Sequence, residues 1–384
     1  MSAIKKWVSS LLIVLFCISL SGCWNYRGLN KISIVSGIAI DRQAGTNNYH
    51  LTMEIIDFSE AGKKDLGKPQ LIESEGKTIF DAVRNAKKKL FKKLYFSDTK
   101  IIVISNQIAK EEGISSILDW FLRDAELRET IKPIISQEKT AKEILMVKGM
   151  DEKIVSEEIE RMIDIDKKMV ASTKKINNYQ VFNLLQGEKE TSLVLPAVHC
   201  TLNQDKKIVE LNGVAIFKAD RLQGYLSAEE TQYYLFGVDE IKGSIIAFPF
   251  ARSNEKNQDN FSLEVNQNKT KRSYTFDENR LKVIFDVKTI ADLGEVGTDI
   301  DVSKTDTLEQ IKFAAESRLK ENMEEVIKKS QLEFGCDVLG IGAIIHKSDP
   351  ALWYKLKENW TYYVQSMEIE IRPNLVITNT GSMK

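Results

Sequence analysis

The sequence predicts an α/β (α+β) protein with three mixed domains, each a largely antiparallel or mixed sheet with packed helices. Segments of alternating apolar residues, typical of strands, are interspersed with segments whose apolar residues recur every three or four positions, typical of helices. The length of 384 residues fits two or three domains, and 28% charged residues are usual for a globular chain. The expected division is a leader at 1–22 and domains at 23–148, 149–240 and 241–384.

The leader has the composition of a bacterial lipoprotein signal peptide. A lysine pair precedes an almost wholly apolar stretch at 7–20. The stretch ends in a lipobox, which consists of Leu20, Ser21, Gly22 and Cys23. The Cys23 thiol is the group that accepts a diacylglyceryl lipid, and the small residues before it fit the peptidase. We therefore expect a mature chain that begins at Cys23 outside the cytoplasm.

Two other interpretations of the leader are weaker. A transmembrane helix needs about 18 or more apolar residues, whereas Ser9, Ser10 and Ser19 interrupt this shorter stretch. A soluble secreted protein carries a similar leader, but the cysteine would then be a coincidence. Lipid attachment explains both features, because two acyl chains such as palmitate, at about 0.8 kcal/mol per buried CH2, hold a protein firmly on a bilayer.

The first expected domain begins with a hairpin and continues with alternating helices and strands. Apolar residues alternate along 32–40 and again along 49–55, with a polar turn between the two segments. Helical spacing continues from Thr78 to Leu94. The remaining expected elements are strands at 101–104 and 131–135 and helices at 114–122 and 140–146.

The middle domain is expected to contain helices at 151–170 and 179–185, then strands at 193–202 and 208–217. A helix at 227–236 has the clearest start. Ser227 is followed three residues later by Glu230, which is the spacing of a capping box. A boundary is expected near residue 240, where glycines cluster.

The last domain has the clearest pattern. Strands are expected at 261–265, 272–276 and 281–289, with one face buried and one face wet. A long helix follows at 307–334, and Gly335 stands where a helix of this kind ends. A helix at 353–364 and a final strand at 369–377 complete the domain.

The residues with chemical potential give no catalytic or metal-binding pattern. His50, His199 and His346 lie far apart without metal-ligand spacing, and the sequence contains no nucleotide-binding or hydrolase motif. We expect no cofactor and no enzyme activity, and an envelope hydrolase has little support. Cys200 and Cys336 are expected to be separate thiols, although an oxidising compartment would permit a disulfide between them.

One basic cluster stands out in a chain whose formal net charge of −1 gives no indication of a nucleic-acid partner. It consists of Lys87, Lys88, Lys89, Lys92 and Lys93. On the expected helix these lysines form a wet face opposite the apolar positions. They either belong to an ordinary soluble rim or contact anionic lipid head groups or an acidic partner.

Three motifs resemble one known family. The first combines residues 22–29 (Gly-Cys-Trp-Asn-Tyr-Arg-Gly-Leu) with 34–41 (Ile-Val-Ser-Gly-Ile-Ala-Ile-Asp). The second is residues 211–218, and the third begins with Asp337-Val338-Leu339-Gly340-Ile341-Gly342 and continues to Trp353 and Trp360. Together they resemble the spore germinant receptor C-subunits, the Ger(x)C lipoproteins, along the whole mature chain.

This resemblance implies a function as well as a fold. Members of the family are non-enzymatic subunits of a nutrient germinant receptor in the spore inner membrane, together with membrane-bound A and B subunits. The resemblance implies three α/β domains, and the only residue role that it carries over is that of Cys23 as lipid acceptor. The alternative is an extracytoplasmic solute-binding lipoprotein that delivers a small nutrient to a membrane partner, although the antiparallel strands at 261–289 argue against a two-lobed binding protein.

Overall fold

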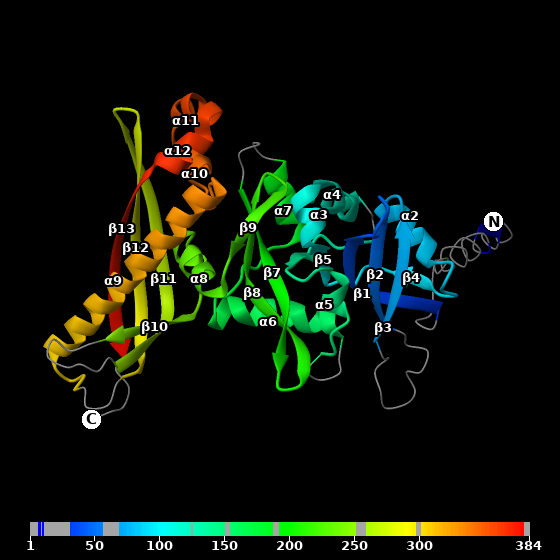
Figure 1. Ribbon diagram of the computed structural model, residues 1–384, viewed down its shortest axis with the longest axis horizontal. Coiled ribbons are helices and arrows are strands. Elements are labelled where there is room, and N and C mark those ends of the chain that lie inside the picture. Colours follow the sequence, from blue (N-terminus) through cyan, green and yellow to red (C-terminus); the bar gives the residue numbers. More distant parts are fainter. Residues whose placement is uncertain are drawn as a thin grey trace.

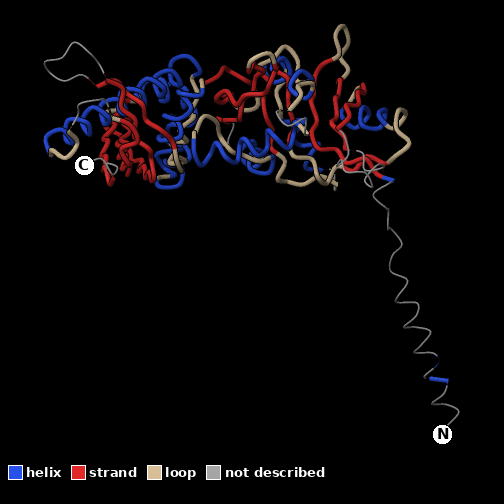
Figure 2. The backbone as a smooth tube through the Cα atoms, turned by 90° about the horizontal axis from the view of Figure 1, so that it is seen from below, coloured by secondary structure: helices blue, strands red, loops and turns tan. Residues whose placement is uncertain are grey.

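The protein is an elongated body with a sheet in each half (Figure 1). A second view, turned by 90°, shows the same long outline, with the strands of the C-terminal sheet gathered at one end (Figure 2). The computed structural model describes residues 7–8, 10, 31–56, 69–123, 126–149, 154–186, 192–250, 259–296 and 301–379. The expected α/β class is confirmed.

The first sheet has nine strands in the order β3-β2-β1-β5-β6-β7-β8-β9, and β4 pairs with β1. The strands are β1 Ile32–Arg42, β2 Tyr49–Ile56, β3 Pro69–Gly76, β4 Lys93–Tyr95, β5 Ile101–Ser105, β6 Lys132–Ser136, β7 Ser192–Asn203, β8 Lys206–Lys218 and β9 Arg221–Leu226. The strands β1, β5, β6 and β7 are parallel neighbours, and antiparallel pairs extend the sheet on both sides.

This sheet runs across residue 148 without a break, because β6 and β7 pair with each other. The pairing is short and joins Ile135 to Ala197 and Ser136 to Val198. Strands on both sides of residue 148 are therefore hydrogen-bonded in one sheet, and the division into three domains stays a prediction.

Helices cover both faces of the first sheet. One face packs against α2 Ile79–Ala86, α3 Asn106–Glu111, α4 Ser115–Arg123 and α7 Asn178–Leu185, and the other against α5 Lys142–Leu145 and α6 Val155–Met169. The alternation along β1 accounts for the two layers, since Ile38 and Ile40 enter one apolar cluster and Ala39 enters the other. The central strand β5 is fully buried, which explains its continuous apolar sequence.

The second sheet has the order β10-β11-β12-β13, and its last strand runs parallel to β12. Its strands are β10 Ser244–Phe250, β11 Asp259–Asp277, β12 Arg280–Glu295 and β13 Glu368–Asn379. The two expected strands at 261–265 and 272–276 are one 19-residue strand, β11, which β12 pairs along its length.

The helices of this half are α8 Ala228–Gly237, α9 Thr305–Lys329, α10 Ile341–Ser348, α11 Pro350–Leu356 and α12 Trp360–Ser366. A short π-helix, η2 Ser330–Phe334, extends α9, and a short 3-10 helix, η3 Lys357–Asn359, precedes α12. The expected capping box is confirmed, because the Ser227 hydroxyl accepts the Glu230 N–H at 3.1 Å and the Glu230 carboxylate accepts the Ser227 N–H at 2.7 Å. Gly335 ends the long helix with a positive φ of 58°, also as expected.

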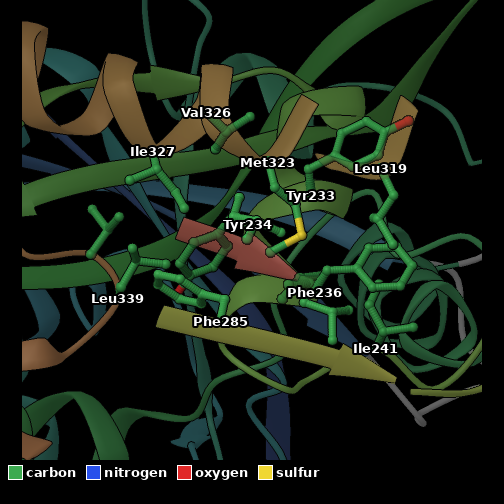
Figure 3. Close-up of a cluster of buried hydrophobic side chains, with 14 of the residues drawn as sticks. Tyr233, Tyr234, Phe236, Ile241, Phe285, Leu319, Met323, Val326, Ile327 and Leu339 are labelled. Atoms are coloured by element: carbon green, nitrogen blue, oxygen red, sulfur yellow. The ribbon is translucent and has the colours of Figure 1, made fainter. Parts of the chain in front are cut away.

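One apolar cluster joins the two halves. In it, Phe236 of α8 lies among Met323 of α9 and Phe285 of β12 (Figure 3). The same cluster includes Val194 of β7 and Val214 of β8, which belong to the first sheet. The two sheets therefore share buried apolar surface, and α8 contributes to it from between them.

Buried carboxylates hold helix starts onto the first sheet. Glu54 of β2 accepts the Val155 N–H at 2.9 Å and the Ser156 N–H at 3.0 Å, at the beginning of α6. Asp41 of β1 accepts the Ala141 N–H at 2.7 Å, at the beginning of α5. Burial raises the pKa of Asp41, and the backbone donors counteract part of that effect.

Candidate functional site

The predicted lipidation residues lie outside the described part of the chain. These are Leu20, Ser21, Gly22 and Cys23. The described residues resume at Lys31, and β1 begins at Ile32. Among the described residues, no helix is long and apolar enough to cross a membrane.

The basic cluster lies on a turn and not on the expected helix. The helix α2 ends at Ala86, and the following N–H groups bond three residues back, as in the 3.1 Å bond from Lys88 to Asn85. Leu94 fits the helical spacing of the expected helix at 78–94, but it is buried in a strand, so the prediction of a helix is wrong beyond Ala86. That strand, β4, pairs in parallel with the first three residues of β1. We call residues 87–92 the lysine turn.

The lysine turn exposes only part of the cluster. Lys87, Lys88 and Lys89 face solvent. Lys92 is buried, with its ammonium nitrogen 5.4 Å from the ring centroid of Phe91. Lys93, the first residue of β4, forms an ion pair with Glu126. The three exposed lysines are therefore the ones that are able to meet a partner.

His50 and His199 lie on strands, as expected, whereas His346 lies on α10, where its ring stacks on Trp353 at 6.0 Å. The His50 Nε2 lies 3.1 Å from a Glu73 carboxylate oxygen, across neighbouring strands. His199 lies opposite Glu210 on β8, at 2.9 Å. Within the described residues, no group of three or more His, Cys, Asp or Glu side chains is arranged to hold a metal ion.

Cys200 and Cys336 are not joined by a disulfide, as expected. Burial raises the pKa of Cys200 to about 11, and the nearby Glu138 adds to that effect. Thiolate is the reactive form of cysteine, so the Cys200 thiol is a poor nucleophile at neutral pH.

A cavity between the two halves was not predicted from the sequence. It has a volume of about 410 Å³, and its walls come from β7, α8, β11 and the segment that leads into α10. Its polar lining includes Lys174, Tyr234, Glu240, Arg272 and Asp337, and its apolar lining includes Val194, Val338, Trp353 and Trp360. These polar residues lie between positions 174 and 337, and no single local motif contains them.

Lys174 and Glu240 form an ion pair at this cavity. The Lys174 ammonium lies 2.9 Å from Glu240 and 3.1 Å from the Tyr234 hydroxyl. Burial alone lowers the pKa of Lys174, but the adjacent Tyr234 and Glu240 outweigh burial and raise it. The raised pKa favours the cationic form of Lys174 beside the cavity.

Asp337 organises the opposite wall. Its carboxylate accepts the Ile341 N–H at 2.9 Å and the Gly342 N–H at 2.7 Å, which caps α10. Burial raises the pKa of Asp337, and these backbone donors lower it in part. At Gly342 a Cβ atom would lie 2.9 Å from the Trp353 ring, so glycine permits the close packing. The third family-like motif thus forms one wall of the cavity.

Comparisons with known proteins place this chain in a family. Residues 25–200 match the family model described as "Spore germination protein N-terminal domain", and residues 212–381 match "Spore germination B3/ GerAC like, C-terminal". The chain belongs to the Ger(x)C family of spore germination proteins. The resemblance seen in the sequence is confirmed.

Relatives of this Ger(x)C protein match it almost end to end. Spore germination protein KC of Bacillus subtilis (strain 168) is 26% identical over 98% of this chain and 97% of its own length. Spore germination protein B3 of the same organism is 23% identical over 98% and 99%. The crystal structure of the GerBC protein superposes with a TM-score of 0.59 and 21% identity, over 89% of this chain and 97% of that one. That likeness supports the fold.

Proposed function

We propose that this chain is the lipid-anchored C-subunit of a nutrient germinant receptor in the spore inner membrane. The observation that carries the proposal is the match of both halves of the chain to spore germination family models. The lipobox at residues 20–23 supports an anchor on the extracytoplasmic face. The subunit acts as a non-enzymatic scaffold for membrane-bound A and B subunits.

A tether of this kind favours assembly through effective concentration. A lipid anchor confines the chain to the membrane that holds its partners, so encounter no longer depends on diffusion from bulk solution. The large folded body then supplies contact surface. On this proposal, deletion of the A and B subunits lowers the amount of the chain in spore membranes or scatters it.

Replacement of Cys23 tests the anchor. We expect the Cys23→Ala chain to partition into the aqueous phase of a detergent phase separation and to impair germination through this receptor. Cys200→Ala is the matched control, because Cys200 is a free thiol in the folded body, and it leaves partitioning unchanged. A Cys23→Ala chain that still partitions with detergent would refute the anchor.

The cavity favours a second candidate, a solute-binding lipoprotein. A recess of about 410 Å³ with tryptophan walls and a fixed cation has the size and mixed polarity of small-molecule sites. Calorimetry of the purified chain with amino acids and sugars tests this candidate. A specific micromolar ligand, whose binding is lost when Trp353 at the cavity wall is replaced by alanine, would favour solute delivery over the scaffold.

A further inference from the structure

The lysine turn combines positive charge with an exposed aromatic side chain. Phe91 is 92% exposed, the highest value among the large apolar residues of the described chain. Lys87, Lys88 and Lys89 precede it, with only Leu90 between, and face solvent. A lone exposed apolar residue is ordinary on a protein surface, but an aromatic ring beside three ammonium groups matches a membrane interface, where rings enter the head-group layer and lysines meet lipid phosphates.

We propose that the lysine turn lies on an anionic lipid bilayer, with Phe91 in the head-group region and the three lysines at lipid phosphates. The inference rests on the lipid anchor of the proposed function. It deepens that function, since it assigns the face of the folded body that meets the membrane.

The position of the turn supports this assignment. The turn leads straight into β4, whose Lys93 pairs with Ile32 at the start of β1. Cys23 lies about nine residues before Ile32, and a fully extended chain of that length spans at most about 30 Å. A lipid on Cys23 therefore holds the turn close to the bilayer surface.

The local charges leave the turn positive. Two acidic groups beside the turn are engaged with other lysines, because Glu126 pairs with Lys93 and Glu73 pairs with Lys142 at 2.6 Å. Lys89 donates to the Glu73 backbone carbonyl at 2.7 Å, which fixes its direction without neutralising it. Among the described residues, no carboxylate forms an ion pair with Lys87 or Lys88.

The opposite end of the body supplies a control. Figure 1 shows α2 and β4 at one end of the molecule and α9 at the other. Phe313 of α9 is 71% exposed, so it matches Phe91 in residue type and in access to solvent. A body that lies on the membrane through the lysine turn keeps Phe313 in water.

The experiment uses the full lipidated chain in vesicles of phosphatidylglycerol and phosphatidylcholine. Phe91→Cys and Phe313→Cys chains carry an environment-sensitive fluorophore, and labelled unaltered chain gives the background from Cys200 and Cys336. We expect a blue shift and quenching by nitroxide-labelled lipid at position 91 only. In 1 M salt, where the Debye length is about 3 Å, both effects are lost while the chain stays on the vesicles.

Variants that lack the lysine charges measure how much those charges contribute to docking. Lys87→Gln, Lys88→Gln and Lys89→Gln together lower the docking equilibrium constant about a hundredfold, from roughly a fivefold contribution of each lysine near an anionic surface. All three side chains are exposed, so these changes leave the fold intact. The control variant carries Lys206→Gln and Lys207→Gln. Both lysines are exposed at the β7–β8 hairpin, and we expect these changes to leave docking unchanged.

Three results overturn the proposal in different ways. Equal fluorescence at positions 91 and 313, on a chain that remains on the vesicles, refutes docking and leaves the anchor standing. A chain that does not stay on the vesicles refutes the anchor, and the docking inference falls with it. Protection of position 91 in native spore membranes but not in pure lipid also contradicts the proposal, since it assigns the turn to a protein partner.

Discussion

Glu54 is the buried carboxylate whose loss we expect to damage the first sheet most selectively. It lies on β2 and receives hydrogen bonds from Val155 and Ser156 at the start of α6. It also accepts the Ser36 hydroxyl of β1 at 3.1 Å. The residue before α6, Ile154, offers no side-chain cap. Glu54 therefore takes the place of a local N-cap and connects two strands to a helix on the sheet face.

The size of the effect follows from these bonds. In Glu54→Ala, two buried N–H groups lose a charged acceptor, and each such loss costs about 1.5–3 kcal/mol. We expect α6 to lose about 4 kcal/mol of stability against local opening. Glu54→Gln keeps one acceptor oxygen and the side-chain shape, so about 2 kcal/mol is lost.

Native-state hydrogen exchange of the α6 amides measures this loss directly, because it reports the free energy of local opening. The matched control is Glu75→Ala, an exposed glutamate on the neighbouring strand β3, for which we expect a change below about 0.5 kcal/mol. Equal protection of α6 in Glu54→Ala and Glu75→Ala would refute the capping role of Glu54.

Three further predictions concern other positions. Gly213→Ala should lower the free energy of unfolding by about 3 kcal/mol or more in thermal or urea denaturation, because φ is +76° and the new Cβ would lie 1.9 Å from a β9 carbonyl oxygen. Gly45→Ala is the control, since φ is +75° but nothing lies within 4 Å, and it should cost only about 1 kcal/mol. Equal costs would contradict the steric argument. Ser227→Ala should cost about 1 kcal/mol by the same assay through loss of the α8 cap, and an unchanged midpoint would count against it. The pKa of Cys200 is raised to about 11, so its thiolate fraction and its alkylation rate should grow tenfold per pH unit from pH 8 until that pKa. A cysteine placed at the exposed Leu202 should react much faster at pH 8, and equal rates would refute the assigned shift.

Elements with strong local patterns were predictable from the sequence. The hairpin of β1 and β2 has clean alternation and a polar turn, and the structure pairs Ile38 with Met53 and Ile40 with Leu51 as antiparallel neighbours. The capping box of α8 and the glycine stop at Gly335 follow from local backbone chemistry, so short sequence windows contain them.

Elements that depend on distant partners were not predictable. The strand β3 has a mostly polar sequence and exists because β2 offers it a hydrogen-bonding edge. The segment 87–94 has helical spacing, yet pairing of β4 with β1 overrides it. The continuous first sheet depends on the pairing of β6 with β7, strands separated by about 60 residues, for which no local signal exists.

The cavity is the part of the candidate site that sequence reasoning missed. Its partly buried Lys174 and its buried Asp337 come from segments that meet only when the second half folds against α8. A lysine and an aspartate are unremarkable in sequence, and only their burial distinguishes them. The Asp337-to-Gly342 motif was visible as a resemblance, but its contact with Trp353 was not.

The central claim is that this chain assembles with membrane subunits of a germinant receptor while anchored by lipid. The most direct measurement is purification of the tagged mature chain from spore inner membranes in mild detergent, with mass spectrometry of the co-purifying proteins. We expect recovery of a multi-span membrane subunit and a second membrane-bound subunit, together with a lipid-modified Cys23. Recovery of the chain alone, or only with soluble proteins, would contradict it.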